Sequence, residues 1–103
     1  MDVELRYFDD CPNWRQTYEH LTALRAEMPE LEVSLRIIDT AEDAERFEFL
    51  GSPSVVVNGT DLFGDPIAPV GLTCRVYVTP EGTAGSPTVD QLRAALTSAA
   101  RSI

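Results

Sequence analysis

The two cysteines are the residues of this chain best suited to chemistry. Cys11 lies in the stretch Asp-Asp-Cys-Pro-Asn-Trp, and Cys74 is followed directly by Arg75. The residues before Cys11 alternate in polarity as a strand does, and Trp14 begins an apolar stripe at helical spacing. Cys11 is therefore predicted on the first turn of a helix, where free N–H groups and the helix dipole stabilise a thiolate. The thiolate is the reactive form of cysteine.

Charged residues near Cys11 act in opposite directions. The helix N-terminus, Arg15 and Arg75 favour a thiolate, whereas Asp9 and Asp10 oppose it. We therefore expect the pKa of Cys11 to lie below that of a free thiol, with a smaller shift than in a strong oxidant. We expect Asp10 to cap the helix through its side-chain oxygen.

The rest of the pattern predicts the elements that position the cysteines. Their expected order is β-α-β-α-β-β-insert-α within one domain, residues 1–103. The first half should contain a strand at 3–8, a helix from 11 to about 28, a strand at 32–39 and a short helix capped by Thr40. A hairpin at 54–63 that turns at Asn58-Gly59 should follow. After it we expect an irregular insert at 64–87, with a short strand over 74–78, and a last helix that begins with a capping box at 88–91.

Composition narrows the class of protein. The formal charge of −9 argues against nucleic acid or an anionic membrane as a partner. Two cysteines are too few for a disulfide-stapled secreted scaffold, and no apolar stretch is long enough to span a membrane. The chain starts on a strand without a signal peptide, so we expect a cytoplasmic protein. His20 has no second histidine to join, and we expect neither a metal nor a cofactor.

These features together resemble the thioredoxin superfamily over nearly the whole chain: the order of elements, the Cys-Pro after the first strand and Ser52-Pro53 before a hairpin. Within it, the chain is similar to small bacterial proteins with a Gly-Ser-Pro-Ser/Thr hairpin and a Gly-Leu-x-Cys-Arg-x-Tyr segment. Some of those proteins carry labels that link them to alkylmercury lyase. The resemblance implies an α/β fold, a four-stranded mixed sheet with helices on both faces, and a cis Ser52-Pro53 bond against the active-site cysteine.

The sequence departs from the Cys-x-x-Cys pattern of thioredoxins, because Trp14 occupies the second cysteine position. We expect Trp14 to pack in the core; the alternative is an aromatic wall beside a substrate. Cys74 is the candidate for the missing second thiol. The return strand of the hairpin ends at the same end of the sheet as Cys11, so the insert is expected to bring Cys74 within disulfide range. The alternative is a buried apolar Cys74 in a short strand.

The leading hypothesis is a thiol redox protein and possible thiol–disulfide oxidoreductase, with a protein or a low-molecular-weight thiol or disulfide as partner. Cys11 would be the nucleophile and Cys74 the resolving thiol. The expected substrate-binding residues are Pro12, Trp14, Ser52, Pro53 and Arg75.

Two other functions stay open. In a non-catalytic thioredoxin-like binding module, Cys11 would be inert and an apolar patch would be exposed elsewhere. A protein that captures a soft metal such as mercury would direct both sulfurs into one open pocket. A redox protein with Cys11 as its nucleophile requires an accessible Cys11 with a lowered pKa, and a buried Cys11 would instead favour the binding module.

Overall fold

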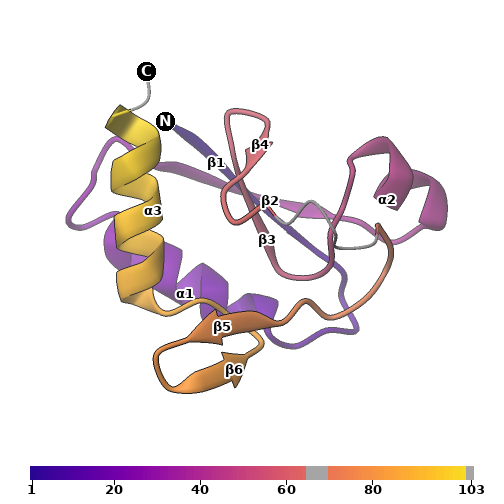
Figure 1. Cartoon of the computed structure of the whole chain (residues 1–103). Helices are drawn as coiled ribbons and strands as arrows, with labels where there is room; N and C mark the ends of the chain where they lie inside the picture. Colours follow the sequence, from indigo (N-terminus) through magenta and orange to yellow (C-terminus); the bar gives the residue numbers. More distant parts are fainter. Residues whose placement is uncertain (65–69, 102–103) are drawn as a thin grey trace.

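The computed structural model describes residues 1–64 and 70–101 of the 103-residue chain. The elements follow the expected order, with one extra hairpin in the insert (Figure 1). They are β1 (Asp2–Tyr7), α1 (Trp14–Leu24), β2 (Glu32–Ile37), α2 (Ala41–Arg46), β3 (Ser54–Val57), β4 (Thr60–Asp61), β5 (Tyr77–Thr79), β6 (Gly82–Ala84) and α3 (Val89–Arg101).

Four of the strands form one mixed sheet in the order β2-β1-β3-β4. β1 pairs with β2 in parallel, with Val3 opposite Val33 and Leu5 opposite Leu35. β3 is antiparallel to β1, and β4 is antiparallel to β3. The prediction of a four-stranded mixed sheet whose first two strands are parallel is therefore confirmed.

The main core lies between this sheet and the two longer helices, α1 and α3, which contact and cross each other (Figure 1). Alternate residues of β1 and β3 point inward, and the stripes of α1 and α3 meet them. The core contains Val3, Leu5, Leu21, Leu24, Leu31, Val55, Val57, Leu92 and Leu96. The short helix α2 packs instead in a second cluster with Ile38 and Phe49. We expected helices on both faces of the sheet; the second face is covered less than the first, because only the short α2 packs away from the main core.

Local sequence signals act where they were predicted. The Thr40 hydroxyl accepts a hydrogen bond from the N–H of Asp43, 3.1 Å away, and so caps α2. Thr88 and Gln91 form the expected reciprocal capping box at the start of α3. Asn58 and Gly59 both have positive φ, 49° and 88°, as a tight hairpin turn requires.

Three boundaries differ from the expectation. α1 begins at Trp14 rather than Cys11, and the residue that precedes it, Asn13, makes no side-chain capping hydrogen bond. Asp10 is therefore not the cap. The strand expected over 74–78 begins only at Tyr77, because Cys74 pairs with Ser52 instead. The insert residues 65–69, part of the path expected to carry the chain to Cys74, lie outside the described residues.

The Ser52-Pro53 peptide bond is cis, as expected. None of the helices in the described part of the chain is long and apolar enough to cross a membrane.

Candidate functional site: a buried and an exposed cysteine

The sulfurs of Cys11 and Cys74 lie 2.6 Å apart, although the two residues are 63 positions apart in the chain. Both are free thiols. The prediction that the insert brings Cys74 to Cys11 is therefore confirmed. The expected exposure is wrong: Cys11 is 0% exposed, and Cys74 is the exposed member of the pair. Cys11 is buried because it precedes α1 and lies beneath the segment that carries Cys74.

That segment, residues 71–77, is held by its backbone against the chain that enters β3. The N–H of Ser52 donates to the carbonyl of Thr73 and the N–H of Arg75 donates to the carbonyl of Ser52, both at 2.8 Å. Ser52 and Cys74 thus form a parallel β-bridge. The N–H of Gly71 donates to the carbonyl of Phe49 at 3.1 Å. Cys74 therefore reaches Cys11 through regular backbone pairing.

Gly51 allows this close approach. Its φ of +114° favours glycine, and a Cβ at this position would lie 3.0 Å from the Thr73 carbonyl oxygen and 3.1 Å from Cβ of Arg75. A larger residue at position 51 would therefore push residues 71–77 away from Ser52.

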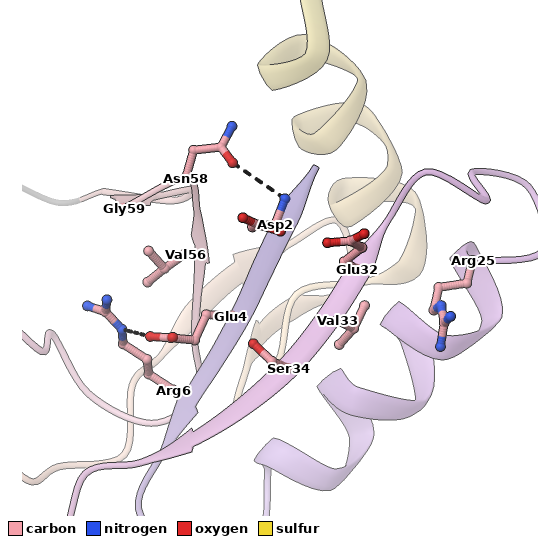
Figure 2. Close-up of a pocket in the computed structure, with 10 residues that line it drawn as sticks. All are labelled: Asp2, Glu4, Arg6, Arg25, Glu32, Val33, Ser34, Val56, Asn58 and Gly59. Carbon is pink, nitrogen blue, oxygen red and sulfur yellow. Dashed lines mark hydrogen bonds and ion pairs between the residues drawn. The ribbon is translucent and has the colours of Figure 1, made fainter.

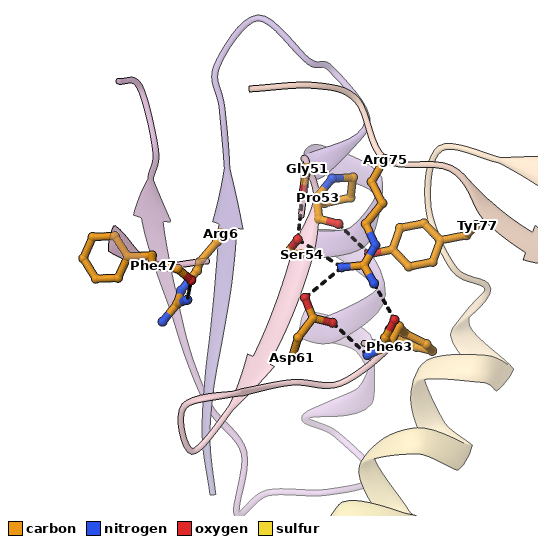
Figure 3. A network of polar contacts seen from close by, with 9 residues as sticks. All are labelled: Arg6, Phe47, Gly51, Pro53, Ser54, Asp61, Phe63, Arg75 and Tyr77. Carbon is orange, nitrogen blue, oxygen red and sulfur yellow. Dashed lines mark hydrogen bonds and ion pairs between the residues drawn. The ribbon is translucent and has the colours of Figure 1, made fainter. Parts of the chain in front are cut away.

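The side chain of Arg75 anchors the same segment from below (Figure 3). Its Nη1 lies 2.8 Å from a carboxylate oxygen of Asp61 and 3.1 Å from the hydroxyl of Ser54, and its Nη2 donates to the Phe63 carbonyl. Arg75 is 9% exposed. We expected this residue to bind substrate beside the cysteines, whereas here its guanidinium donors are occupied within the chain. The guanidinium is held in the hairpin of β3 and β4, where Asp61 lies.

Tyr77, the last residue of the segment 71–77, is held in place by its side chain. Its hydroxyl donates to the carbonyl of Pro53 at 2.5 Å, and the guanidinium of Arg75 lies 4.9 Å from its ring centroid (Figure 3). Burial raises the pKa of the Tyr77 hydroxyl well above its ordinary value, despite the nearby guanidinium. The hydroxyl therefore stays protonated and remains a hydrogen-bond donor to Pro53.

Two donors face the sulfur of Cys11. The thiol of Cys74 donates to it, and the side-chain amide of Asn13 donates from 3.8 Å. The hydrogen bond to Cys11 raises the pKa of Cys74, with a further contribution from burial and the charge of the partner. The Cys11 thiol in turn lies 3.6 Å from the carbonyl of Ser52, to which it donates.

Asn13 has room beside Cys11 because residue 85 is glycine. A Cβ at Gly85 would fall 2.1 Å from the amide nitrogen of Asn13. Neither residue was singled out from the sequence. The available signal was a polar residue two positions after Cys11, together with a second Gly-Ser-Pro in the insert.

Of the expected substrate-binding residues, Trp14 packs as predicted. Its ring stacks on Tyr7 with centroids 4.2 Å apart and contacts the main core. Its indole nitrogen is buried with no hydrogen-bond partner among the described residues. Pro12 is exposed beside Cys11.

Ser52 and Pro53 were expected to offer backbone groups to a bound partner. In this structure those groups are already paired within the chain: Ser52 with residues 73 and 75, and Pro53 with the Tyr77 hydroxyl. The buried hydroxyl of Ser52 has no described partner. A partner that pairs with this edge would therefore have to displace residues 71–77.

A hollow in the surface lies away from the cysteines. A pocket of about 650 Å³ lies on the thinly covered side of the sheet, and Figure 2 shows Glu4, Arg6, Ser34 and Val56 around it. Cys11 and Cys74 do not line it. Of the two sulfur-bearing residues, only Cys74 is exposed at the surface.

The spacing of the sulfurs does not suit a metal held between them. A thiolate lies about 2.3 Å from zinc, and two sulfurs on one such ion are separated by well over 3 Å. The sulfurs here are 2.6 Å apart, and the described residues contain no group of three or more metal-ligating side chains. Metal capture would require the pair to open first.

Comparison of the chain with protein-family models, with curated proteins and with solved structures gives no match in any of the three.

Proposed function

We propose that this chain is a thiol–disulfide redox protein of thioredoxin-like architecture, with Cys11 and Cys74 as its redox pair. The observation that carries the proposal is the 2.6 Å separation of the two sulfurs with only Cys74 exposed. A disulfide needs sulfurs in contact, and the backbone pairing of residues 71–77 already supplies that contact. The parallel β1 and β2, the antiparallel hairpin and the positions of Cys11 and Pro53 agree with the architecture.

The burial of Cys11 reverses the roles expected from the sequence. Cys74 is the sulfur that meets the partner, and Cys11 is the resolving sulfur. In the reducing direction, the Cys74 thiol gives up its proton to solvent and its sulfur attacks a substrate disulfide. One substrate thiolate leaves, and Cys74 is joined to the other half of the substrate.

Cys11 then attacks the Cys74 sulfur. The internal disulfide forms, and the second substrate sulfur leaves with the proton that Cys11 held. Two electrons pass from the cysteine pair to the substrate disulfide, and an external thiol must return them. In the opposite direction, a thiolate attacks the exposed Cys74 sulfur and Cys11 leaves. The amide of Asn13 supports the departing thiolate.

Single-cysteine variants test this assignment. Reduced Cys11→Ser treated with glutathione disulfide should accumulate a mixed disulfide on Cys74, because the resolving sulfur is absent. The wild type should pass through the same adduct to an internal disulfide, as mass spectrometry of the intact protein would show. Cys74→Ser should react far more slowly, since Cys11 is 0% exposed. Faster adduct formation on Cys11 would restore Cys11 as the attacking sulfur.

A non-catalytic binding module is the second candidate, because β2 is an edge strand of the sheet with exposed apolar side chains. Leu35 is 43% exposed and Ile37 is 46% exposed, and the burial of Cys11 also fits an inert thiol. If neither single-cysteine variant forms an adduct and the wild type forms no internal disulfide, this candidate replaces the redox proposal.

A further inference from the structure

Three arginines surround one aromatic ring at a distance from the cysteine chemistry. The guanidinium carbons of Arg6, Arg36 and Arg46 lie 5.1, 4.7 and 5.5 Å from the ring centroid of Phe47. Three of the eight Arg and Lys residues of a chain with a formal charge of −9 therefore lie around one ring. Cation–π contact accounts for each arginine singly, but three like charges on one ring repel one another.

The fold brings these arginines together from different elements. Arg6 and Arg36 are register partners on the parallel strands β1 and β2, so they lie on the same side of the sheet. Arg46 is the last residue of α2, and Phe47 follows it. The carbonyl of Phe47 accepts a hydrogen bond from Arg6 at 3.0 Å, as Figure 3 shows, and this contact fixes the ring at the sheet.

A single carboxylate compensates for the three positive charges. One oxygen of Glu4 accepts from Arg6 and from Arg36, the latter at 3.0 Å. Burial opposes ionisation of Glu4, but these two hydrogen bonds outweigh it and lower its pKa. The acidic residues of α2, among them Glu42 and Asp43, form no ion pair with an arginine in the part of the chain that the structure describes. The cluster keeps a local charge of about +2.

The outer two arginines still have donors to offer. Arg36 is half exposed, and only its Nε is occupied, by Glu4. Arg46 is exposed, and its one contact among the described residues is the ring of Phe47. Guanidinium groups present paired N–H donors that match carboxylate and phosphate oxygens. The ring restrains both side chains, which reduces the entropy lost on binding.

We propose that Arg36 and Arg46, held beside Phe47, bind the doubly charged anionic end of a small ligand, either a phosphate ester or a dicarboxylate. The hollow of about 650 Å³ in Figure 2 is lined by Glu4 and Arg6, not by Arg36 or Arg46, and so lies next to the proposed anion site, where the rest of such a molecule would extend. Asp2 and Glu32 also line it with only Arg25 to offset them, so the remainder of the ligand carries no further negative charge. This site is independent of the cysteine pair.

A titration followed by NMR tests the proposal. Inorganic phosphate and succinate are added separately at constant ionic strength, and the Arg Nε–H and backbone N–H signals of residues 36, 46 and 47 are followed. We expect saturable shifts with at least one anion, with a dissociation constant of about 1–10 mM. Saturation by phosphate alone identifies the phosphate-ester class, and saturation by succinate alone identifies the dicarboxylate class.

Arg36→Gln and Arg46→Gln should each weaken this binding about five-fold or more, because each removes a charged donor pair. Arg101→Gln, an exposed arginine at the end of α3, is the matched loss of one positive charge and should leave the affinity unchanged. Shifts that stay linear up to about 50 mM of both anions would overturn the proposal. An equal loss of affinity in Arg101→Gln would do the same, because it would show a general charge effect.

Discussion

Substitution of Gly51 by alanine should loosen the hold on Cys74 specifically. The new Cβ would lie 3.0 Å from the Thr73 carbonyl oxygen and 3.1 Å from Cβ of Arg75, tighter than ordinary contact. One of those contacts is with backbone, which cannot rotate away. The backbone at Gly51 also has a φ of +114°, a region that costs alanine about 1–3 kcal/mol wherever it occurs.

Gly82 offers a control with nearly the same backbone. Its φ is +115°, and a Cβ there would meet no atom within 4 Å. Gly82→Ala therefore carries the cost of the backbone conformation alone, whereas Gly51→Ala adds the clash with residues 73 and 75. Overpacking of this kind costs about 1–3 kcal/mol. We expect reduced Gly51→Ala to be less stable than reduced Gly82→Ala by that amount in urea unfolding.

The same difference should appear in the redox equilibrium of the cysteine pair. If residues 71–77 move away from Ser52 to relieve the clash, the Cys11–Cys74 disulfide must bring them back. Since about 1.4 kcal/mol corresponds to a factor of ten, the effective concentration of the pair against glutathione should fall about five-fold to a hundred-fold in Gly51→Ala. Gly82→Ala should match the wild type. Equal stability and equal effective concentration in the two variants would refute the role assigned to Gly51.

Three further results are expected. The hydrogen bond to Cys11 raises the pKa of Cys74 above 9.0, so this bond stabilises the folded protein fully below that pH and its contribution is lost as pH rises through the raised pKa. Unfolding of the reduced wild type should show this loss of stability, and unfolding of Cys74→Ser should not. Cys11→Ser should alkylate faster than the wild type at Cys74 near pH 8. Asp61→Asn leaves a buried guanidinium without its counterion and should cost about 2–4 kcal/mol in urea unfolding. Asp90→Asn breaks an exposed ion pair and should cost much less, and similar losses in the two variants would contradict the anchoring role of Asp61. Because the pKa of Glu4 is lowered, ionised Glu4 contributes fully to folding stability above pH 4.5, and this contribution is lost as pH falls through the lowered pKa. Glu4→Gln should therefore make the free energy of unfolding less dependent on pH in the acid range. An unchanged pH dependence would show that the hydrogen bonds of Glu4 do not favour its ionised form.

Much of the fold was predictable because its signals are local. Thr40 and the box at residues 88–91 satisfy backbone groups within three positions, and Asn58-Gly59 adopts positive φ through its own sterics. Hydrophobic alternation placed the inward residues of β1, since Val3 and Leu5 are both fully buried. The proximity of Cys11 and Cys74 also followed from sequence, because the direction of each strand determines the end of the sheet at which the next loop begins.

What the tertiary structure alone decided is which cysteine is accessible and what holds it. Burial depends on every segment that crosses a residue, and residues 71–77 cross Cys11 through pairing with Ser52. The partner of Arg75 likewise depends on the position of Asp61 in another hairpin, where the ion pair is buried. These contacts join residues between 14 and 63 positions apart, and no local pattern records them. For that reason the sequence predicted that the two sulfurs lie together, whereas only the structure shows which of the two cysteines is exposed.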